Sequence, residues 1–126
     1  MSSEAVQAPL YPPCRVVGDL VFVSGQNAEV NGYIQSDNIV DQTKTIFELL
    51  AVTLAGAGCT FQDVIKVNGF LHTEDDFEQF NQVYREYFGP QHGSYPARSM
   101  ALGVLTQKHQ QHKALIEIEL VAQKRA

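Results

Sequence analysis

The last strand-like segment of the chain constrains the fold more than any other feature of the sequence. Apolar and polar residues alternate between Ile116 and Ala122, as they do in a β-strand with one buried face. The alternation predicts one face with Glu117, Glu119 and Val121 and an opposite face with Ile116, Ile118 and Leu120. Such a strand needs a sheet to receive it and other elements to cover its apolar face.

Two segments with helical periodicity can cover that face. Between Ile39 and Leu54 apolar residues recur at helical spacing, and the polar residues, Gln42 among them, are expected mostly on the other faces. Gly56 and Gly58 are expected to stop this helix. A second helix is predicted after Thr73, whose side chain suits an N-cap. Its apolar stripe comprises Phe77, Phe80, Tyr84 and Phe88, with Asn81 and Arg85 on other faces.

The remaining strands are predicted in the β-rich runs around these helices. They are residues 20–24, 64–71 and 98–105, and Gly69 indicates a bulge or a close backbone approach in the second run. Asn31-Gly32 predicts a hairpin turn, because both turn residues must accept a positive φ. The order is hairpin, helix, strand, helix, strand, strand. We therefore predict an α+β two-layer sandwich in which two helices cover one face of a mixed β-sheet.

Length, charge and cysteine content narrow the class of protein. The 126 residues predict a single domain over residues 1–126, with 1–10 as a loose lead-in. A net charge of −5 without a basic run disfavours nucleic-acid binding, and no apolar run is long enough to cross a membrane. Cys14 and Cys59 show no disulfide-framework or zinc spacing, so we expect reduced thiols and a cytoplasmic protein.

Arg98 and Glu117 are the residues whose chemistry suits an active site. Arg98 opens a predicted strand after Pro96-Ala97, where its planar fork could bind a carboxylate; a surface arginine or a structural salt bridge is the alternative. Glu117 or Glu119 could act as a general base, and the alternative is a solvent-facing strip of sheet. His109 and His112 lack further ligands nearby, so no metal site is predicted.

Several motifs together resemble a known family. The segments Val21-Phe-Val-Ser-Gly-Gln26, Tyr95-Pro-Ala-Arg-Ser99 and Ile116-Glu-Ile-Glu119 occur in this order, with the phenylalanine-rich helix before the second of them. From about Tyr11 to Ala122 the chain resembles the YjgF/RidA family of reactive intermediate (enamine/imine) deaminases. The resemblance implies a chorismate-mutase-like fold, a homotrimer, and active sites in the clefts between subunits.

The resemblance also implies roles for individual residues. Arg98 would hold the carboxylate of a small imine or enamine substrate, and Glu117 would hold the attacking water and transfer protons. The implied substrate-binding positions are Tyr11, Gly25, Asn81 and Met100, the second and fourth through their backbone. Products would be a 2-keto acid and ammonia, and no metal or other cofactor is implied.

Two departures from the family pattern bear on the substrate. Met100 stands where the deaminases usually carry cysteine, and the turn at residues 107–112 is longer than usual. A relative that deaminates another enamine, such as an aminomuconate-type ring-breakdown product, is therefore an alternative to 2-aminoacrylate. A non-enzymatic ligand-binding or chaperone-like trimer is a second alternative, and chorismate-mutase-type chemistry rests on fold likeness alone.

Overall fold

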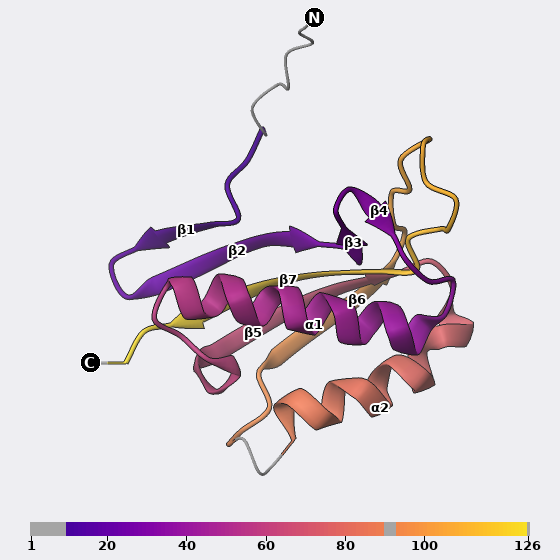
Figure 1. The fold of residues 1–126 in the computed structure, drawn as a ribbon. Helices are drawn as coiled ribbons and strands as arrows, with labels where there is room; N and C mark the ends of the chain where they lie inside the picture. Colours follow the sequence, from indigo (N-terminus) through magenta and orange to yellow (C-terminus); the bar gives the residue numbers. More distant parts are fainter. Residues whose placement is uncertain (1–9, 90–92, 126) are drawn as a thin grey trace, which may run out of the picture.

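The computed structural model describes residues 10–89 and 93–125, and part of the predicted lead-in lies outside these ranges. Within these two ranges seven strands and two α-helices follow one another, and Figure 1 shows how they are arranged. In chain order they are β1 (Cys14–Val17), β2 (Leu20–Gln26), β3 (Glu29–Val30), β4 (Tyr33–Ile34), α1 (Ile39–Gly56), β5 (Val64–Leu71), α2 (Phe77–Phe88), β6 (Ala97–Leu102) and β7 (Ile116–Gln123). Short 3-10 turns precede β5 (η1, Phe61–Asp63) and α2 (η2, Glu74–Asp76).

Five strands form one sheet in the order β1-β2-β7-β5-β6. Strands β5 and β6 pair in parallel, and every other neighbouring pair in this sheet is antiparallel. Both helices lie on the same side of the sheet (Figure 1). The predicted mixed sheet with two helices on one face is therefore confirmed.

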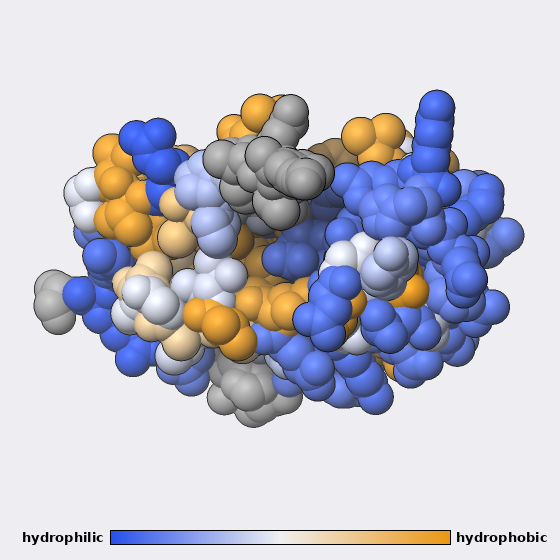
Figure 2. Space-filling view, turned by 45° about the horizontal axis from the view of Figure 1, so that its top comes forward, coloured by the Kyte–Doolittle hydropathy of each residue, from blue (hydrophilic) through white to orange (hydrophobic). Residues whose placement is uncertain are grey.

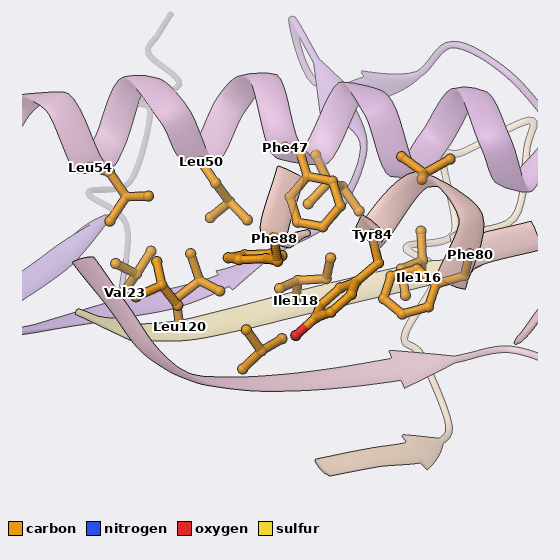
Figure 3. Packing of buried hydrophobic residues seen from close by; sticks show 14 of the residues in the cluster. Val23, Phe47, Leu50, Leu54, Phe80, Tyr84, Phe88, Ile116, Ile118 and Leu120 are labelled. Carbon is orange, nitrogen blue, oxygen red and sulfur yellow. The ribbon is translucent and has the colours of Figure 1, made fainter. Parts of the chain in front are cut away.

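The core lies between the helices and β7 (Figure 3). Exposure alternates along β7, with every second residue from Ile116 to Ala122 buried, as the sequence pattern predicted. The aromatic ring of Phe47 on α1 is fully buried and packs 4.6 Å from Tyr87 and 5.6 Å from Phe88 on α2, centroid to centroid. Burial of each such side chain stabilises the fold by roughly 1.5–3 kcal/mol.

Helix α1 begins and ends where the sequence indicated. Asn38 caps it, because its Oδ1 accepts hydrogen bonds from the amides of Val40 (2.8 Å) and Asp41 (3.1 Å). The helix ends at Gly56, and Gly58 follows with a φ of +78°, which suits a residue without a Cβ.

The expectation for Gln42 was wrong, because its side chain is buried rather than exposed. Its Nε2 donates to the carbonyls of Ser36 (2.7 Å) and Lys113 (2.8 Å), and its Oε1 accepts from the amide of Leu115 (2.9 Å). A buried amide with three hydrogen bonds can replace an apolar residue at such a position. Gln42 thereby ties the start of α1 to the segment that leads into β7.

Several element boundaries differ from the predicted ones. Strand β1 was not predicted; it pairs with β2 across a turn in which Gly18 has a φ of +61°. Strand β6 ends at Leu102 rather than at residue 105, because Gly103 follows with a φ of +123°. Thr73 caps the 3-10 turn η2 instead of α2 itself. The Asn31-Gly32 hairpin is confirmed, with φ values of +54° and +87° at its two turn residues.

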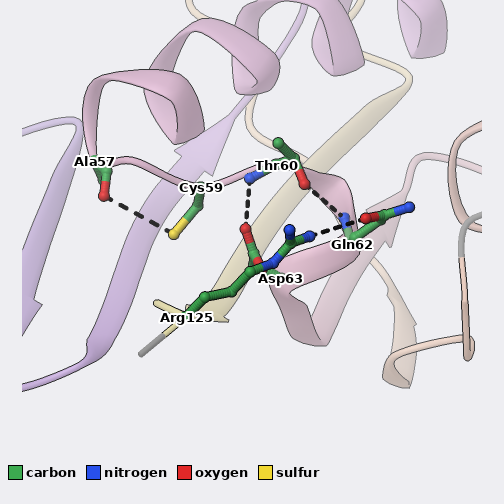
Figure 4. A network of polar contacts seen from close by, with 6 residues as sticks. All are labelled: Ala57, Cys59, Thr60, Gln62, Asp63 and Arg125. Carbon is green, nitrogen blue, oxygen red and sulfur yellow. Dashed lines mark hydrogen bonds and ion pairs between the residues drawn. The ribbon is translucent and has the colours of Figure 1, made fainter.

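The C-terminal end of β7 is fixed to the turn that precedes β5 (Figure 4). Arg125 Nε contacts Asp63 Oδ1 at 2.7 Å, and its Nη2 donates to Gln62 Oε1 at 2.8 Å. Asp63 also accepts from the amide of Thr60 and so completes a capping box at η1. Cys59 is buried beside this network, and burial raises the pKa of its thiol.

The face of the sheet opposite the helices carries both apolar and polar side chains. Phe22 on β2 is 44% exposed. Asn68 Nδ2 donates to Glu119 Oε2 at 3.1 Å across the β5–β7 pair on this face. Within the described ranges no helix covers it (Figure 1), and we call it the open face. Figure 2, which brings the top of Figure 1 forward, shows hydrophobic patches within a largely hydrophilic surface.

Candidate active site in two parts

Arg98 lies on the helix-covered side of the sheet. It stands beside Val67 in the parallel β5–β6 pair, and Val67 belongs to the buried core. Arg98 Nη1 donates to Asn81 Oδ1 on α2 at 2.8 Å. The guanidinium carbon also lies 4.6 Å from the ring centroid of Tyr84 and 5.5 Å from that of Phe77. One amide and the faces of aromatic rings thus fix the orientation of the guanidinium.

Among the residues that the structure describes, no carboxylate forms an ion pair with the guanidinium of Arg98. Within residues 10–89 and 93–125 the structure contains one ion pair, and it joins Arg125 to Asp63. Arginine offers five N–H donors, and a single bond to Asn81 leaves others for a ligand. The alternative of a structural salt bridge at Arg98 therefore does not describe this site, and the arrangement suits bidentate binding of a carboxylate.

A cavity of about 290 Å³ opens beside this arginine, and we call it the arginine cavity. Its lining comprises Asn81, Tyr84, Arg85, Tyr95, Pro96 and Arg98. The rings of Tyr84 and Tyr95 stack almost in parallel, with centroids 6.2 Å apart and planes inclined by 6°. The Tyr84 hydroxyl is buried without a hydrogen-bond partner in the described part of the chain, and burial raises its pKa despite the nearby Arg98 charge.

Glu117 lies on the open face, in β7. Its carboxylate packs directly against Gly25 of β2, where a Cβ would meet the carboxylate Oε2 and would lie 3.1 Å from Cδ. Gly25 stands within the irregularity of the β2–β7 pairing between Val23 and Gln26. Partial burial raises the pKa of Glu117, and the nearby Glu119 charge raises it further. A partly buried carboxyl group with a raised pKa is suited to exchange protons with a bound substrate.

A second cavity, of about 540 Å³, contains Glu117, and we call it the glutamate cavity. Tyr11 and Gly25 line it, as do Glu29, Leu105 and Gln107. Leu105 and Gln107 belong to the segment between β6 and β7, which the sequence marked as longer than usual. This segment therefore forms part of the wall of the glutamate cavity.

The long segment is held against the β3–β4 hairpin. Gln110 Oε1 accepts from the amide of Ile34 at 2.8 Å, and its Nε2 donates to the carbonyl of Gly32 at 2.9 Å. The His109 ring lies 5.4 Å from the ring of Tyr33 in an edge-on arrangement. No cluster of three or more metal-ligating side chains occurs among the residues that the structure describes.

Met100 lies outside both cavities. It follows Arg98 by two residues on β6, and its side chain covers Gly69 of β5, where a Cβ would lie 2.6 Å from the sulfur. The close approach that Gly69 indicated is therefore made by a side chain, and the irregularity of β5 falls between Val64 and Lys66 instead. The flexible Met100 side chain thus occupies the space that a side chain at Gly69 would otherwise take.

The predicted site residues thus fall into two groups within one chain. Arg98 and Asn81 line the arginine cavity on the helix-covered side. Tyr11, Gly25 and Glu117 line the glutamate cavity, and Glu117 lies on the open face. A single chain does not bring Arg98 and Glu117 to one substrate.

Sequence reasoning missed several lining residues, Tyr84, Arg85, Leu105 and Gln107 among them. Tyr84 was placed in the core stripe and Arg85 in solvent, yet both line the arginine cavity. Their spacing of three and four residues from Asn81 puts all three on neighbouring positions of one helix and could have indicated this. Leu105 and Gln107 left no local signal, because only the folding of a long loop brings them beside Glu117.

Comparison with known proteins agrees with this architecture. The family model described as Endoribonuclease L-PSP matches residues 3–124. RutC family protein PH0854 of Pyrococcus horikoshii is 36% identical over 97% of this chain and 94% of its own length. YyfA from Yersinia pestis, whose structure is described as a member of the Rid protein family, has a TM-score of 0.81 and 26% identity, with 93% of this chain and 90% of YyfA covered.

A further relative is TdcF of Escherichia coli, which carries the name of a reactive intermediate deaminase. It is 33% identical over 66% of this chain and 65% of its own length. The crystal structure of TdcF with bound serine has a TM-score of 0.81 and 27% identity, with 94% of this chain and 91% of TdcF covered.

The fold and the matched sequence define an α+β protein of the YjgF/L-PSP type. The chain belongs to the YjgF/Rid family, as its motifs indicated. No helix in the described ranges is long and apolar enough to cross a membrane.

Proposed function

We propose that the protein is an enamine/imine deaminase that hydrolyses 2-imino and 2-enamino acids to 2-keto acids and ammonia. The observation that carries this proposal is the guanidinium of Arg98, which has no ion pair among the described residues and which Asn81 and aromatic rings hold at the wall of a cavity. Kinship with a protein named as a reactive intermediate deaminase supports it further.

The chemistry needs an anchor and a proton-transfer group. Arg98 binds the substrate carboxylate through paired N–H donors, which holds the C=N carbon in a fixed position. Glu117 holds a water molecule and takes a proton from it while the water oxygen bonds to the C=N carbon. It then passes this proton to the substrate nitrogen. The hydroxyl of the resulting carbinolamine then gives its proton through Glu117 to the nitrogen as the C–N bond breaks, so that ammonia leaves and a carbonyl forms. An enamine reaches the imine by protonation at carbon, and the whole sequence transfers no electrons to a cofactor.

For both residues to act on one substrate, the proposed site needs a second copy of the chain. Arg98 and Glu117 point from opposite sides of one sheet, so we propose that each active site joins the arginine cavity of one subunit to the glutamate cavity of its neighbour. A homotrimer satisfies this, because three copies in a closed ring bury three equal interfaces. The partly apolar open face, with Phe22 44% exposed, is suited to contact other copies.

The cysteines bear on the compartment in which the protein works. Cys14 and Cys59 are free. We propose a cytoplasmic protein, since reduced cysteines are typical of that compartment.

The test is hydrolysis of imino acids produced in solution from amino acids by an oxidase. We expect the protein to accelerate ammonia release, and Arg98→Ala to reduce kcat/KM about a hundredfold, since charged hydrogen bonds contribute roughly 1.5–3 kcal/mol each. Lys44→Gln, which removes an exposed charge on α1, is the matched control. Equal rates for the wild type and Arg98→Ala would refute the proposal. Ligand binding without turnover of any imine would favour a non-enzymatic binding protein.

A further inference from the structure

We infer that Arg85 is a second anion-binding residue of the arginine cavity, and that the preferred substrates are imines or enamines of dicarboxylic acids. This inference rests on the proposed function, because it assigns one carboxylate of the substrate to Arg98. It adds a residue and a substrate class that the anchor alone does not specify.

The first support is placement. Arg85 follows Asn81 by four residues on α2, so both side chains project from one side of the helix. Asn81 binds the guanidinium of Arg98, and Arg85 lines the same cavity as both. The two arginines therefore reach one cavity from different elements, α2 and β6.

The second support is charge. The protein carries a net charge of −5, yet the described lining of this cavity includes two arginines and no acidic residue. The described residues also hold no ion pair for Arg85 or for Arg98. Two unpaired cations at one small cavity repel each other, and a ligand with two negative charges relieves that repulsion at both.

The third support is the size and wall of the cavity. Its volume of about 290 Å³ corresponds to roughly ten water molecules. The stacked rings of Tyr84 and Tyr95 form an apolar wall beside the two arginines. A short carbon chain with a carboxylate at each end suits such a cavity, because the chain can lie against the rings and the carboxylates can reach the two guanidiniums.

A simpler role for Arg85 is that of a helix-terminal cation. It lies in the last turn of α2, where a positive charge stabilises the helix dipole. That role predicts a loss of stability on substitution and no change in ligand choice. The two roles therefore separate in a binding experiment.

The experiment measures binding of 2-oxoglutarate and of 2-oxobutanoate by calorimetry. For the wild type we expect the dicarboxylate to bind at least about tenfold more tightly, as one added charged hydrogen-bonding pair allows. Arg85→Gln should lose this preference, because its affinity for the dicarboxylate falls much more than its affinity for the monocarboxylate. Lys44→Gln should keep both values. Equal affinities in the wild type, or a preference that survives in Arg85→Gln, would overturn the inference.

Turnover separates this inference from the proposed function. The imine of 2-oxoglutarate and that of 2-oxobutanoate are compared as substrates of the wild type and Arg85→Gln. Turnover of both imines without preference overturns the dicarboxylate inference and supports the deaminase. A binding preference that depends on Arg85, without turnover of either imine, supports the anion site and contradicts the deaminase.

Discussion

The two faces of the five-stranded sheet differ in what their side chains can do. On the covered face, β7 presents only isoleucine, leucine and alanine to the helices, and all of them are buried. On the open face the same strand presents Glu117 and Glu119 beside a half-exposed Phe22 on β2. The side chains of β7 on the covered face are fully buried by contacts within the chain. The open face leaves apolar and charged side chains partly exposed, where they can contact other molecules.

The difference between the two faces indicates where a substrate can bind. Arg98 lies at the edge of the covered face, where α2 leaves a cavity, and Glu117 lies on the open face. Fully packed side chains have no free hydrogen-bonding group to offer a substrate. Arg98 and Glu117, in contrast, each line a cavity that a substrate can enter. The predictions that follow test the difference between the faces, in order of expected effect.

The largest effect is expected at the reactive residue of the open face. Glu117→Gln keeps the shape of the side chain and removes its capacity to exchange protons. We expect kcat to fall by about 10²–10⁴, the usual contribution of a general acid–base group. Steady-state ammonia release measures it. Glu119→Gln, which alters the neighbouring carboxylate that binds Asn68, should retain most of the activity; a loss equal to that of Glu117→Gln would contradict the assignment.

The next effect is on stability, at the covered face. Phe47 is fully buried among Phe61, Tyr87 and Phe88, and Phe47→Ala should lower the free energy of unfolding by about 3–5 kcal/mol. Chemical denaturation measures this change.

Phe22→Ala is the matched variant on the open face. We expect a smaller loss that depends on protein concentration, because Phe22 is proposed to contact other copies of the chain. Equal losses for the two variants at all concentrations would show that the faces do not differ in this way.

A smaller effect is expected at Gly25. A Cβ at this position would displace the Glu117 carboxylate, which is the flexible end of its side chain. Gly25→Ala should therefore lower kcat about tenfold, since small misplacements of a catalytic group reduce the rate strongly. Its thermal midpoint should stay close to that of the wild type. Gly69→Ala, which displaces Met100 outside both cavities, is the control; a kcat unchanged in Gly25→Ala would contradict the positioning role.

The smallest effect is on the pH dependence of stability. The pKa of Glu117 lies above its ordinary value of 4.5, so the folded protein holds a proton that the unfolded chain releases. The stability that this group contributes is present below pH 4.5 and is lost as the pH rises through the higher value in the folded protein. Denaturation of the wild type and Glu117→Gln across this range should show the decline in the wild type alone, and parallel curves would contradict it.

Most of the fold was predictable because its elements show a periodic pattern of apolar and polar residues over short stretches of sequence. The alternation of β7, the apolar stripes of both helices and the Asn31-Gly32 turn each depend on residues that are neighbours in sequence. Strand β1 and the burial of Gln42 were not predictable in this way. Strand β1 pairs locally, with β2 across the turn at residues 18–19, but its exposure does not alternate and so gave no periodicity to detect. The burial of Gln42 depends instead on a distant partner, the Lys113 carbonyl.

The candidate site was predictable only in part. Family motifs indicated Arg98 and Glu117, but no sequence pattern shows that they lie on different sides of one sheet. Arg85 escaped notice because an arginine off the apolar stripe of a helix usually lies in solvent. Only the folded chain shows that it shares a cavity with Arg98.

The most direct test of this account is complementation between two inactive variants. Arg98→Ala and Glu117→Gln are unfolded together, mixed in equal amounts and refolded, and ammonia release from an imino acid is measured. If each site takes Arg98 from one subunit and Glu117 from its neighbour, the refolded mixture as a whole regains about one quarter of the wild-type activity. A mixture no more active than the separate variants would contradict the shared site.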